Sequence, residues 1–289
     1  MRDAMRAAKA DEVLHAMPGR NRSLIVPREH GAWGILLIPL FTGACAGLLA
    51  GGRSESLAPF TLVALSLFWL RTPVESWAGT SPIRARTPRE IQLVRAAVLF
   101  LAMVAASCLI WLLWGGRNRA LIWIGCAAGS AFLVQSLVRW IWRSARTAAQ
   151  MVGAVGLTTT APAAYYVVTG HLNTVAWSLW AANLLFAINQ IQFVQLRIHA
   201  ARAGNRRQKL AFGRGFLGSQ ALLMTLILAI CTAGAFRWPA ALAFLPVLVR
   251  GFAWFGAEPE PLVIHALGKS ELVHACVFGL LLAIGMQFP

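Results

Sequence analysis

The sequence predicts an all-α protein whose helices cross a lipid bilayer about nine times. The chain is 58% hydrophobic, and its mean hydropathy of +0.64 lies outside the range of soluble globular proteins. Its apolar residues gather in long runs, each close to the roughly 20 residues that a transmembrane helix needs. Such continuous runs favour a helical bundle, since a membrane β-barrel shows short segments of alternating polarity.

We assign each run to one expected helix. The predicted spans are residues 33–50, 57–70, 93–114, 120–138, 151–169, 174–195, 216–235, 239–255 and 270–288. Residues 1–26 are polar and basic, and we expect them to form a flexible cytoplasmic tail. Residues 27–289 are expected to form one transmembrane domain of nine helices.

The distribution of the 26 Lys and Arg residues predicts the orientation. With the N-terminus in the cytoplasm, all but Arg53, Arg117, Arg119 and Arg237 fall on the cytoplasmic side. Cytoplasmic loops of multi-span proteins carry the excess of positive charge. Nine spans then place the C-terminus outside. The net charge of +16 is explained by arginines beside anionic lipid headgroups, so we expect membrane lipids and no nucleic acid as partners.

Small residues and one proline predict local packing within the spans. Two glycine pairs at an interval of four residues would let helices approach closely, Gly43 with Gly47 and Gly125 with Gly129. In the fifth span, Pro162 follows three threonines at 158–160 and is expected to kink the helix. The threonine hydroxyls can bond to carbonyls freed by such a kink.

The candidate ligand-binding residues all fall at the predicted cytoplasmic face. The sixth span ends in a stripe of polar residues, Asn189, Gln192, Gln195 and His199, which share one side of a helix. A polar stripe at membrane depth is costly unless it faces a wet cavity or neighbouring helices, and both explanations remain open. The other candidates are Arg28, Glu29, His30, Arg71, Glu75, Arg84, Arg86, Arg197, Glu271 and His274. We expect these groups to converge on one cavity.

No metal or cofactor site is expected from the residues. The chain has only two aspartates, Asp3 and Asp11, and both lie in the tail. Its five cysteines fall inside predicted spans without any CxxC pair. Buried cysteines of this kind usually act as small apolar packing residues.

Two family resemblances follow from these motifs. The segment at residues 27–39, PREHGAWGILLIP, and the late SELVH at 270–274 resemble the YwiC-like family of bacterial membrane proteins, which implies a bacterial cytoplasmic membrane and no established chemistry. Nine spans with long polar connections after the second and sixth are similar to the UbiA prenyltransferase superfamily, and a UbiA-like arrangement is the favoured fold. That superfamily holds Mg²⁺ with Asp-rich motifs, which this chain lacks.

The favoured function is therefore a prenyltransferase-like bundle that binds an isoprenoid or another anionic amphipathic lipid without Mg²⁺. Arginines can hold a phosphate or carboxylate directly through forked hydrogen bonds. Whether a reaction occurs is open, with Glu29, His30, Glu271 and His274 as acid or base candidates. The alternatives are a small-solute transporter and an accessory or assembly subunit of a respiratory membrane complex.

The orientation is testable with reporter fusions. A cytoplasmic reporter placed in the connection between Arg197 and Arg214 should be active, and a periplasmic reporter there should be silent. The same pair of reporters placed at Arg53 should give the opposite result. A periplasmic signal from the first connection would contradict the predicted orientation.

Overall fold

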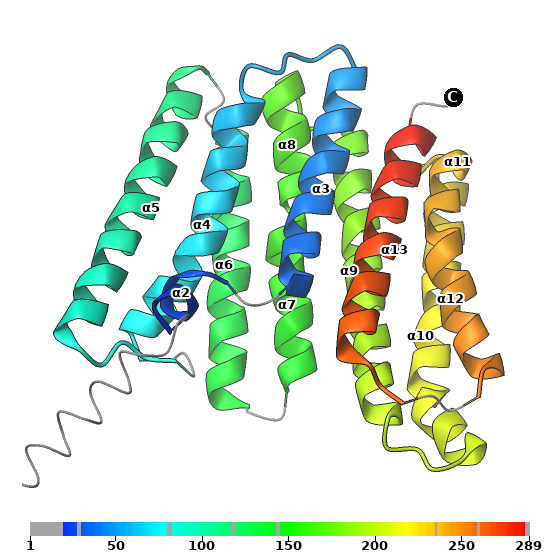
Figure 1. The fold of residues 1–289 in the computed structure, drawn as a ribbon. Coiled ribbons are helices and arrows are strands. Elements are labelled where there is room, and N and C mark those ends of the chain that lie inside the picture. Colours follow the sequence, from blue (N-terminus) through cyan, green and yellow to red (C-terminus); the bar gives the residue numbers. More distant parts are fainter. Residues whose placement is uncertain are drawn as a thin grey trace, which may run out of the picture. The chain divides into compact units, whose positions relative to one another are not determined.

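The computed structural model describes residues 20–27, 30–79, 83–116, 119–142, 145–234, 236–258 and 261–286. Over these ranges the regular structure is entirely helical. The helices are α2 (Arg20–Ile25), α3 (His30–Leu49), α4 (Leu57–Trp77), α5 (Pro88–Trp114), α6 (Arg119–Ile141), α7 (Arg146–Thr158), α8 (Thr160–Thr169), α9 (Thr174–Ala200), α10 (Arg206–Thr232), α11 (Trp238–Ala241), the 3₁₀ helix η1 (Leu242–Phe244), α12 (Leu245–Gly256) and α13 (Ile264–Gly285). Figure 1 shows them in chain order.

The predicted class, an all-α bundle with several membrane spans, is confirmed. Over the described residues, eight helical segments are long and apolar enough to cross a bilayer. The remaining predicted span is α9, which has 27 residues and is therefore about 40 Å long. It is long enough to cross a bilayer. Its amide side chains, Arg197 and His199 make it more polar than the eight apolar segments. The chain is thus a multi-pass membrane protein in which one long helix differs from the others in polarity.

The chain divides into two compact units. Unit 1 comprises Met1–Glu29 and Pro59–Trp111, and unit 2 comprises His30–Ala58 and Leu112–Pro289. Within unit 1, the indole Nε1 of Trp69 donates to the Ile25 carbonyl at 2.8 Å and so ties α2 to α4. The expected tail of residues 1–26 lies mostly outside the described residues.

Helix α9 is the central element of unit 2. It packs against α3, α7, α8, α10 and α12. Its start is defined by Asn173, whose side chain accepts a hydrogen bond from the Ala176 amide at 3.2 Å, an N-cap that satisfies one free helix amide. The buried face of α9 includes Asn183, Asn189 and Gln190. A polar helix is tolerated in an apolar bundle where its polar side chains face protein instead of lipid.

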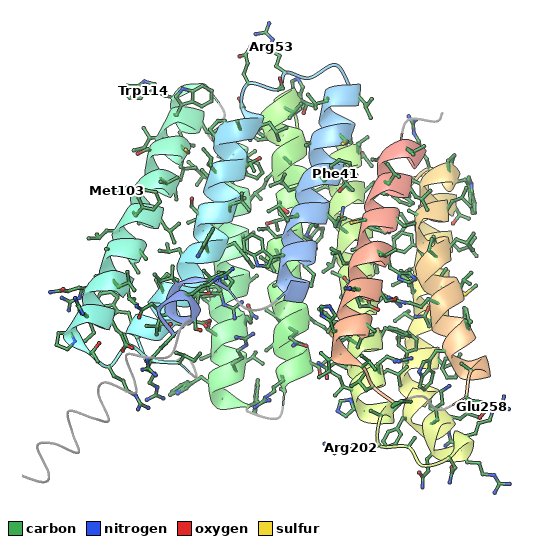
Figure 2. The ribbon with its side chains drawn as sticks, in the orientation of Figure 1. Phe41, Arg53, Met103, Trp114, Arg202 and Glu258 are labelled. Carbon is green, nitrogen blue, oxygen red and sulfur yellow. The ribbon has the colours of Figure 1, made fainter. Side chains whose placement is uncertain are left out.

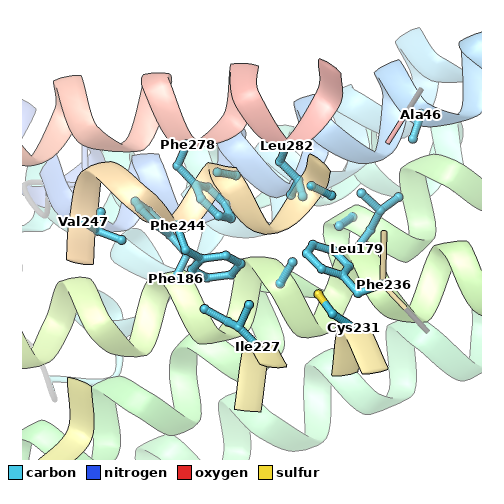
Figure 3. Packing of buried hydrophobic residues seen from close by; sticks show 14 of the residues in the cluster. Ala46, Leu179, Phe186, Ile227, Cys231, Phe236, Phe244, Val247, Phe278 and Leu282 are labelled. Atoms are coloured by element: carbon cyan, nitrogen blue, oxygen red, sulfur yellow. The ribbon is translucent and has the colours of Figure 1, made fainter. Parts of the chain in front are cut away.

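Aromatic rings form the main core of unit 2. Phe186 of α9 stacks on Phe278 of α13 with ring centroids 4.1 Å apart, and Phe244 meets Phe278 edge-on at 5.2 Å (Figure 3). All three side chains are almost completely buried. Offset stacked and edge-on pairs add to the stabilisation that burial provides. This core fixes α13 against α9 and the short helices around Phe244.

The predicted kink in the fifth span is confirmed as a break between α7 and α8. The first of these helices ends at Thr158 and the second begins at Thr160, two residues before Pro162. The hydroxyls of Thr158, Thr159 and Thr160 donate to carbonyls of the preceding turn. Thr160 also donates to the Leu36 carbonyl at 3.1 Å, which joins the break to α3. The threonines therefore satisfy backbone groups where the helix is interrupted.

The two glycine pairs behave differently. A Cβ atom at Gly43 would lie only 2.1 Å from the Ala161 carbonyl oxygen, and one at Gly47 would lie 3.0 Å from Val168. The first pair therefore lets α3 approach α8 closely, as predicted. A Cβ atom at Gly125 or Gly129 would meet no described atom within 4 Å, so the expectation of close approach there was wrong. A spacing of four residues shows that two glycines share one face of a helix. It does not show whether another helix packs against that face.

Replacing Gly43 with Ala should destabilise the protein because the added methyl group would clash with backbone atoms of Ala161. These atoms cannot move aside as a flexible side chain could. Overpacking of this kind costs roughly 1–3 kcal/mol. The matched control is Gly34→Ala in the same helix, where an added Cβ meets nothing within 4 Å. Thermal unfolding in detergent should show a lower Tm for Gly43→Ala alone. Equal Tm values for the two variants would disprove the close contact.

Candidate functional site

Unit 2 has two ends that differ in charge. Figure 2 shows Arg53 at one end and Arg202 with Glu258 at the other. Arg197 and His199 lie in the last turn of α9, and Arg206 and Arg207 open α10, so this second end carries a concentration of basic groups. Cations at a helix C-terminus also interact favourably with the helix dipole, which is a purely structural role.

An open groove lies between α7, α9 and α10 at this basic end. It has a volume of about 300 Å³ and is lined by Thr147, Gln192, Gln195, Leu196, His199, Phe212, Gly215, Phe216 and Ser219. The polar lining comes mainly from α9 and the aromatic lining from α10. Three residues of the predicted stripe, Gln192, Gln195 and His199, therefore do share one face and meet in one place.

The groove's polar groups retain binding capacity. The Gln195 amide nitrogen donates to Gln150 Oε1 at 3.2 Å, and the His199 ring Nδ1 lies 2.7 Å from the Gln195 carbonyl. With Nδ1 placed against a carbonyl, it carries the proton of a neutral ring, and Nε2 is then an acceptor. The same wall presents the rings of Phe212 and Phe216. This groove combines hydrogen-bonding and apolar surface, as an amphipathic ligand requires.

A second polar site lies in the interior of unit 2, where α12 meets α13. The Arg250 Nη1 donates to Glu271 Oε1 at 2.5 Å, and the two side chains are only 10% and 8% exposed. The Gln190 amide donates to the Glu271 carbonyl at 3.1 Å, which connects this buried pair to α9. The guanidinium carbon of Arg250 lies 4.1 Å from the centre of the Phe193 ring. A desolvated cation over an aromatic face gains energy from the ring quadrupole.

Sequence reasoning singled out Glu271 but not Arg250. Arg250 was counted with the cytoplasmic charges, although it falls inside the predicted span 239–255. An arginine within a span is by itself a signal of function, and Arg250 carries that signal in the sequence. Asn189 is buried with no hydrogen-bond partner for either side-chain atom among the described residues.

Lys209 is a third buried charge in unit 2 that the sequence did not indicate. Its side chain is 3% exposed at the start of α10. Its ammonium donates to the carbonyls of Trp254 at 2.6 Å and of Ala257, and it lies 4.6 Å from the Trp254 ring centre. These carbonyls end α12, so the lysine satisfies groups that a helix C-terminus leaves free.

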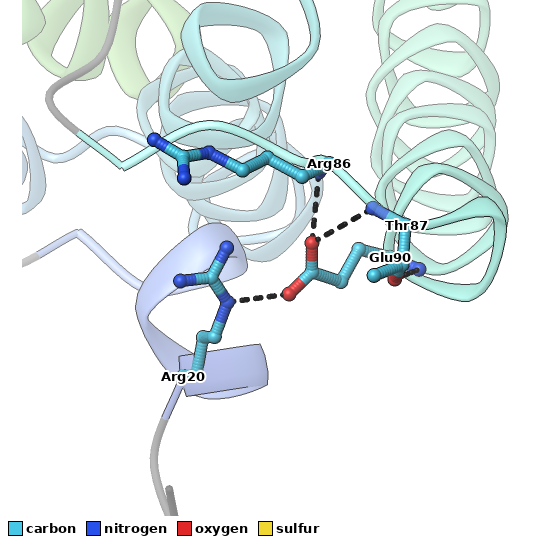
Figure 4. A network of polar contacts seen from close by, with 4 residues as sticks. All are labelled: Arg20, Arg86, Thr87 and Glu90. Atoms are coloured by element: carbon cyan, nitrogen blue, oxygen red, sulfur yellow. Dashed lines mark hydrogen bonds and ion pairs between the residues drawn. The ribbon is translucent and has the colours of Figure 1, made fainter. Parts of the chain in front are cut away.

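The remaining candidates of unit 1 form local structure. Arg71 donates to Glu75 at 2.9 Å, one turn along α4, and Arg84 is exposed. The Arg86 backbone amide donates to Glu90 Oε2 at 2.8 Å, and Arg20 donates to Glu90 Oε1 at 2.5 Å (Figure 4). This hydrogen bond raises the pKa of the Arg20 guanidinium.

Glu90 also forms a capping box with Thr87. The Glu90 amide donates to Thr87 Oγ1, and the Thr87 amide donates to Glu90 Oε2, both at 3.2 Å. The spacing T-x-x-E before an apolar run is the sequence signature of this motif, so it was available for prediction. Glu90 thus starts α5 and fixes α2, which accounts for its burial without a ligand.

Four candidates have no described contact with the groove or the buried pair. Arg28 and Glu29 lie outside the described residues, and the backbone of His30 begins α3. The His274 Nδ1 lies 2.7 Å from the Ser270 carbonyl, one turn earlier in α13. Over the described residues, no three His, Cys, Asp or Glu side chains group as metal ligands would. The convergence of all candidates on one cavity stays a prediction.

Comparison with known proteins identifies the family resemblance. The family model described as YwiC-like protein matches residues 26–165, which include the PREHGAWGILLIP motif. Over these residues the chain is similar to the YwiC-like family. It is also 24% identical over 254 residues to the uncharacterized protein YwiC of Bacillus subtilis (strain 168), covering 88% of this chain and 95% of that protein. The similarity thus covers most of the chain.

No solved structure matches the chain. The UbiA-like arrangement therefore stays a prediction, while the similarity to the YwiC-like family is found by both sequence comparisons. The YwiC-like relationship carries no activity with it, because the Bacillus relative bears an uncharacterized name. Function must be argued from the groove and the interior of unit 2.

Removing one partner of the buried pair should be costly. Glu271→Leu leaves the Arg250 charge unpaired in the bundle, which typically costs roughly 3–5 kcal/mol. The double variant Arg250→Met with Glu271→Leu should recover most of that loss, since apolar side chains of similar size suit the site. Glu75→Leu, at a more exposed pair, should cost less than about 1 kcal/mol. Unfolding in detergent measures all three, and a double variant no more stable than Glu271→Leu would refute this account.

Proposed function

We propose that this protein binds an anionic amphipathic lipid, of the isoprenoid phosphate or phospholipid class, in the groove between α7, α9 and α10. The observation that supports this most directly is the composition of the groove. Amide and imidazole groups of Gln192, Gln195 and His199 face the rings of Phe212 and Phe216 across about 300 Å³. One wall suits a polar headgroup and the other an apolar chain.

The charge around the groove supports an anionic headgroup. Arg197 directly follows the groove residue Leu196 on α9, and Arg206 and Arg207 begin α10. Arginine recognises phosphate through paired hydrogen bonds and keeps its charge at any physiological pH. If the basic end is cytoplasmic, as the arginine distribution predicts, the headgroup would bind at the cytoplasmic side.

The groove contains no carboxylate among its lining residues. Prenyl transfer that depends on Mg²⁺ uses carboxylate ligands, because Mg²⁺ prefers hard anionic oxygens. We therefore propose binding without a metal, and we assign no reaction to the groove. The alternatives remain a small-solute transporter and an accessory or assembly subunit of a respiratory membrane complex.

Retained lipid tests this proposal. Protein purified in a mild detergent should carry anionic lipid that mass spectrometry detects, and added farnesyl phosphate or dioleoyl phosphatidic acid should raise its Tm. Gln192→Leu combined with Gln195→Leu should weaken binding by about tenfold, the loss expected for one or two hydrogen bonds. The matched control is Thr225→Val, an exposed hydroxyl on α10 that bonds only to its own helix at Ala221.

The neutral compounds farnesol and dioleoylglycerol separate headgroup recognition from simple partition of a chain into the groove. We expect them to shift the Tm much less than the anionic probes. Equal shifts from neutral and anionic probes, or undiminished binding in the double variant, would refute the proposal.

A further inference from the structure

The interior of unit 2 contains polar atoms that the protein itself leaves without partners. Among the described residues these include Nε and Nη2 of Arg250, Oε2 of Glu271, and both amide atoms of Gln220, a side chain with no exposed surface. Each such atom in an apolar interior costs free energy comparable to a lost hydrogen bond. An apolar substitute would avoid that cost, which makes the polar groups an unfavourable choice for stability alone.

The unpaired atoms of Arg250 have a defined geometry. The ion pair with Glu271 uses Nη1, while Nε and Nη2 make up the side-on edge of the guanidinium. This edge presents two parallel N–H donors. Carboxylates and phosphates match such a fork with two oxygen atoms, and the fit is lost with lysine. The Phe193 ring covers one face of the guanidinium and limits its rotation.

Gln220 lies on α10 and packs against Gly251, the residue that follows Arg250 on α12. A Cβ atom at Gly251 would lie 2.9 Å from the Gln220 amide nitrogen, so the amide packs directly against the residue that follows Arg250. Glycine at this position provides the room that the amide occupies. A second polar group with donor capacity therefore lies where α10 packs against α12, the helix that carries Arg250.

We propose that Arg250 recognises an oxyanion, either a carboxylate or a phosphate, inside unit 2. Glu271 positions the guanidinium through Nη1, and the Nε–Nη2 edge binds the ligand, with Gln220 as a neighbouring donor. The site is distinct from the groove, because Phe193 covers Arg250 and contacts Phe216 of the groove wall, with ring centroids 5.6 Å apart. The oxyanion is either a free solute or the headgroup of a lipid that enters from the groove. The second source rests on the proposed function.

Binding to the full-length protein in a nonionic detergent tests the proposal. The probes are inorganic phosphate and acetate as free oxyanions, and dioleoyl phosphatidic acid in mixed micelles as a headgroup, with chloride as the control anion. At least one oxyanion should raise the Tm of the wild type where chloride at equal ionic strength does not. Stabilisation by none of the probes would overturn the proposal.

Two variants assign the effect to this site. Arg250→Lys keeps the charge opposite Glu271 but removes the fork, and it should weaken oxyanion binding by about tenfold or more. Gln220→Leu should raise the Tm without any probe, because it removes unpaired buried atoms, and yet weaken binding several-fold. Arg53→Lys, at the far end of unit 2 in Figure 2, should change neither quantity. Unchanged affinity in both Arg250→Lys and Gln220→Leu would refute the assignment.

The groove variants separate the two sources. If Gln192→Leu with Gln195→Leu abolishes binding of phosphatidic acid while phosphate binding persists and depends on Arg250, the interior site takes free oxyanions. The other case is that phosphatidic acid is the sole probe that binds. If both the double variant Gln192→Leu with Gln195→Leu and the single variant Arg250→Lys then abolish its binding, the interior site takes the lipid headgroup. If a lipid binds in the groove and its affinity is unchanged by Arg250→Lys, the result would support the proposed function and reject the interior site.

Discussion

The requirement that polar groups in an apolar bundle find partners within the protein governs this structure. Helix α9 carries its amides into the interior of unit 2, where helices of the same unit surround it. On lipid-facing surface the same side chains would have no partners, at a cost of up to several kcal/mol for each unsatisfied group. The aromatic core of Phe186, Phe244 and Phe278 fixes the helices around it. Packing and polarity thus support each other in unit 2.

The polar interior divides into groups that are satisfied and groups that are not. Asn183 donates to Thr42 and to the Leu179 carbonyl, and the threonines of the α7–α8 break donate to nearby carbonyls. Lys209 satisfies carbonyls at the end of α12. The unpaired edge of Arg250, the amide of Gln220, both side-chain atoms of Asn189 and the Asn183 Oδ1 have no partner among the described residues. The proposed oxyanion would supply partners for Arg250 and Gln220.

The candidate site was partly predictable. The stripe of Gln192, Gln195 and His199 could be placed on one face from spacing alone, because helical periodicity is fixed by backbone geometry. Its neighbours Phe212 and Phe216 could not, since they come from another helix whose rotation depends on packing. Arg250 was visible as a charge within a span, but its partner Glu271 is 21 residues away on a different helix. The local capping box of Thr87 and Glu90 needed only a motif four residues long.

The sequence by itself determined the class, the approximate positions of the long helices, and the interruption before Pro162. Some limits differ, since α10 begins ten residues before and α4 ends seven residues after the predicted span. These features follow from hydropathy and local backbone chemistry, which act over one or a few turns. Only the tertiary structure decided which glycine pair has a neighbour, since Gly43 faces Ala161 while Gly125 faces open space. It also decided that the polar stripe opens on a groove and that Arg250 meets Glu271, because contacts between helices depend on their relative rotation, which one sequence does not encode locally.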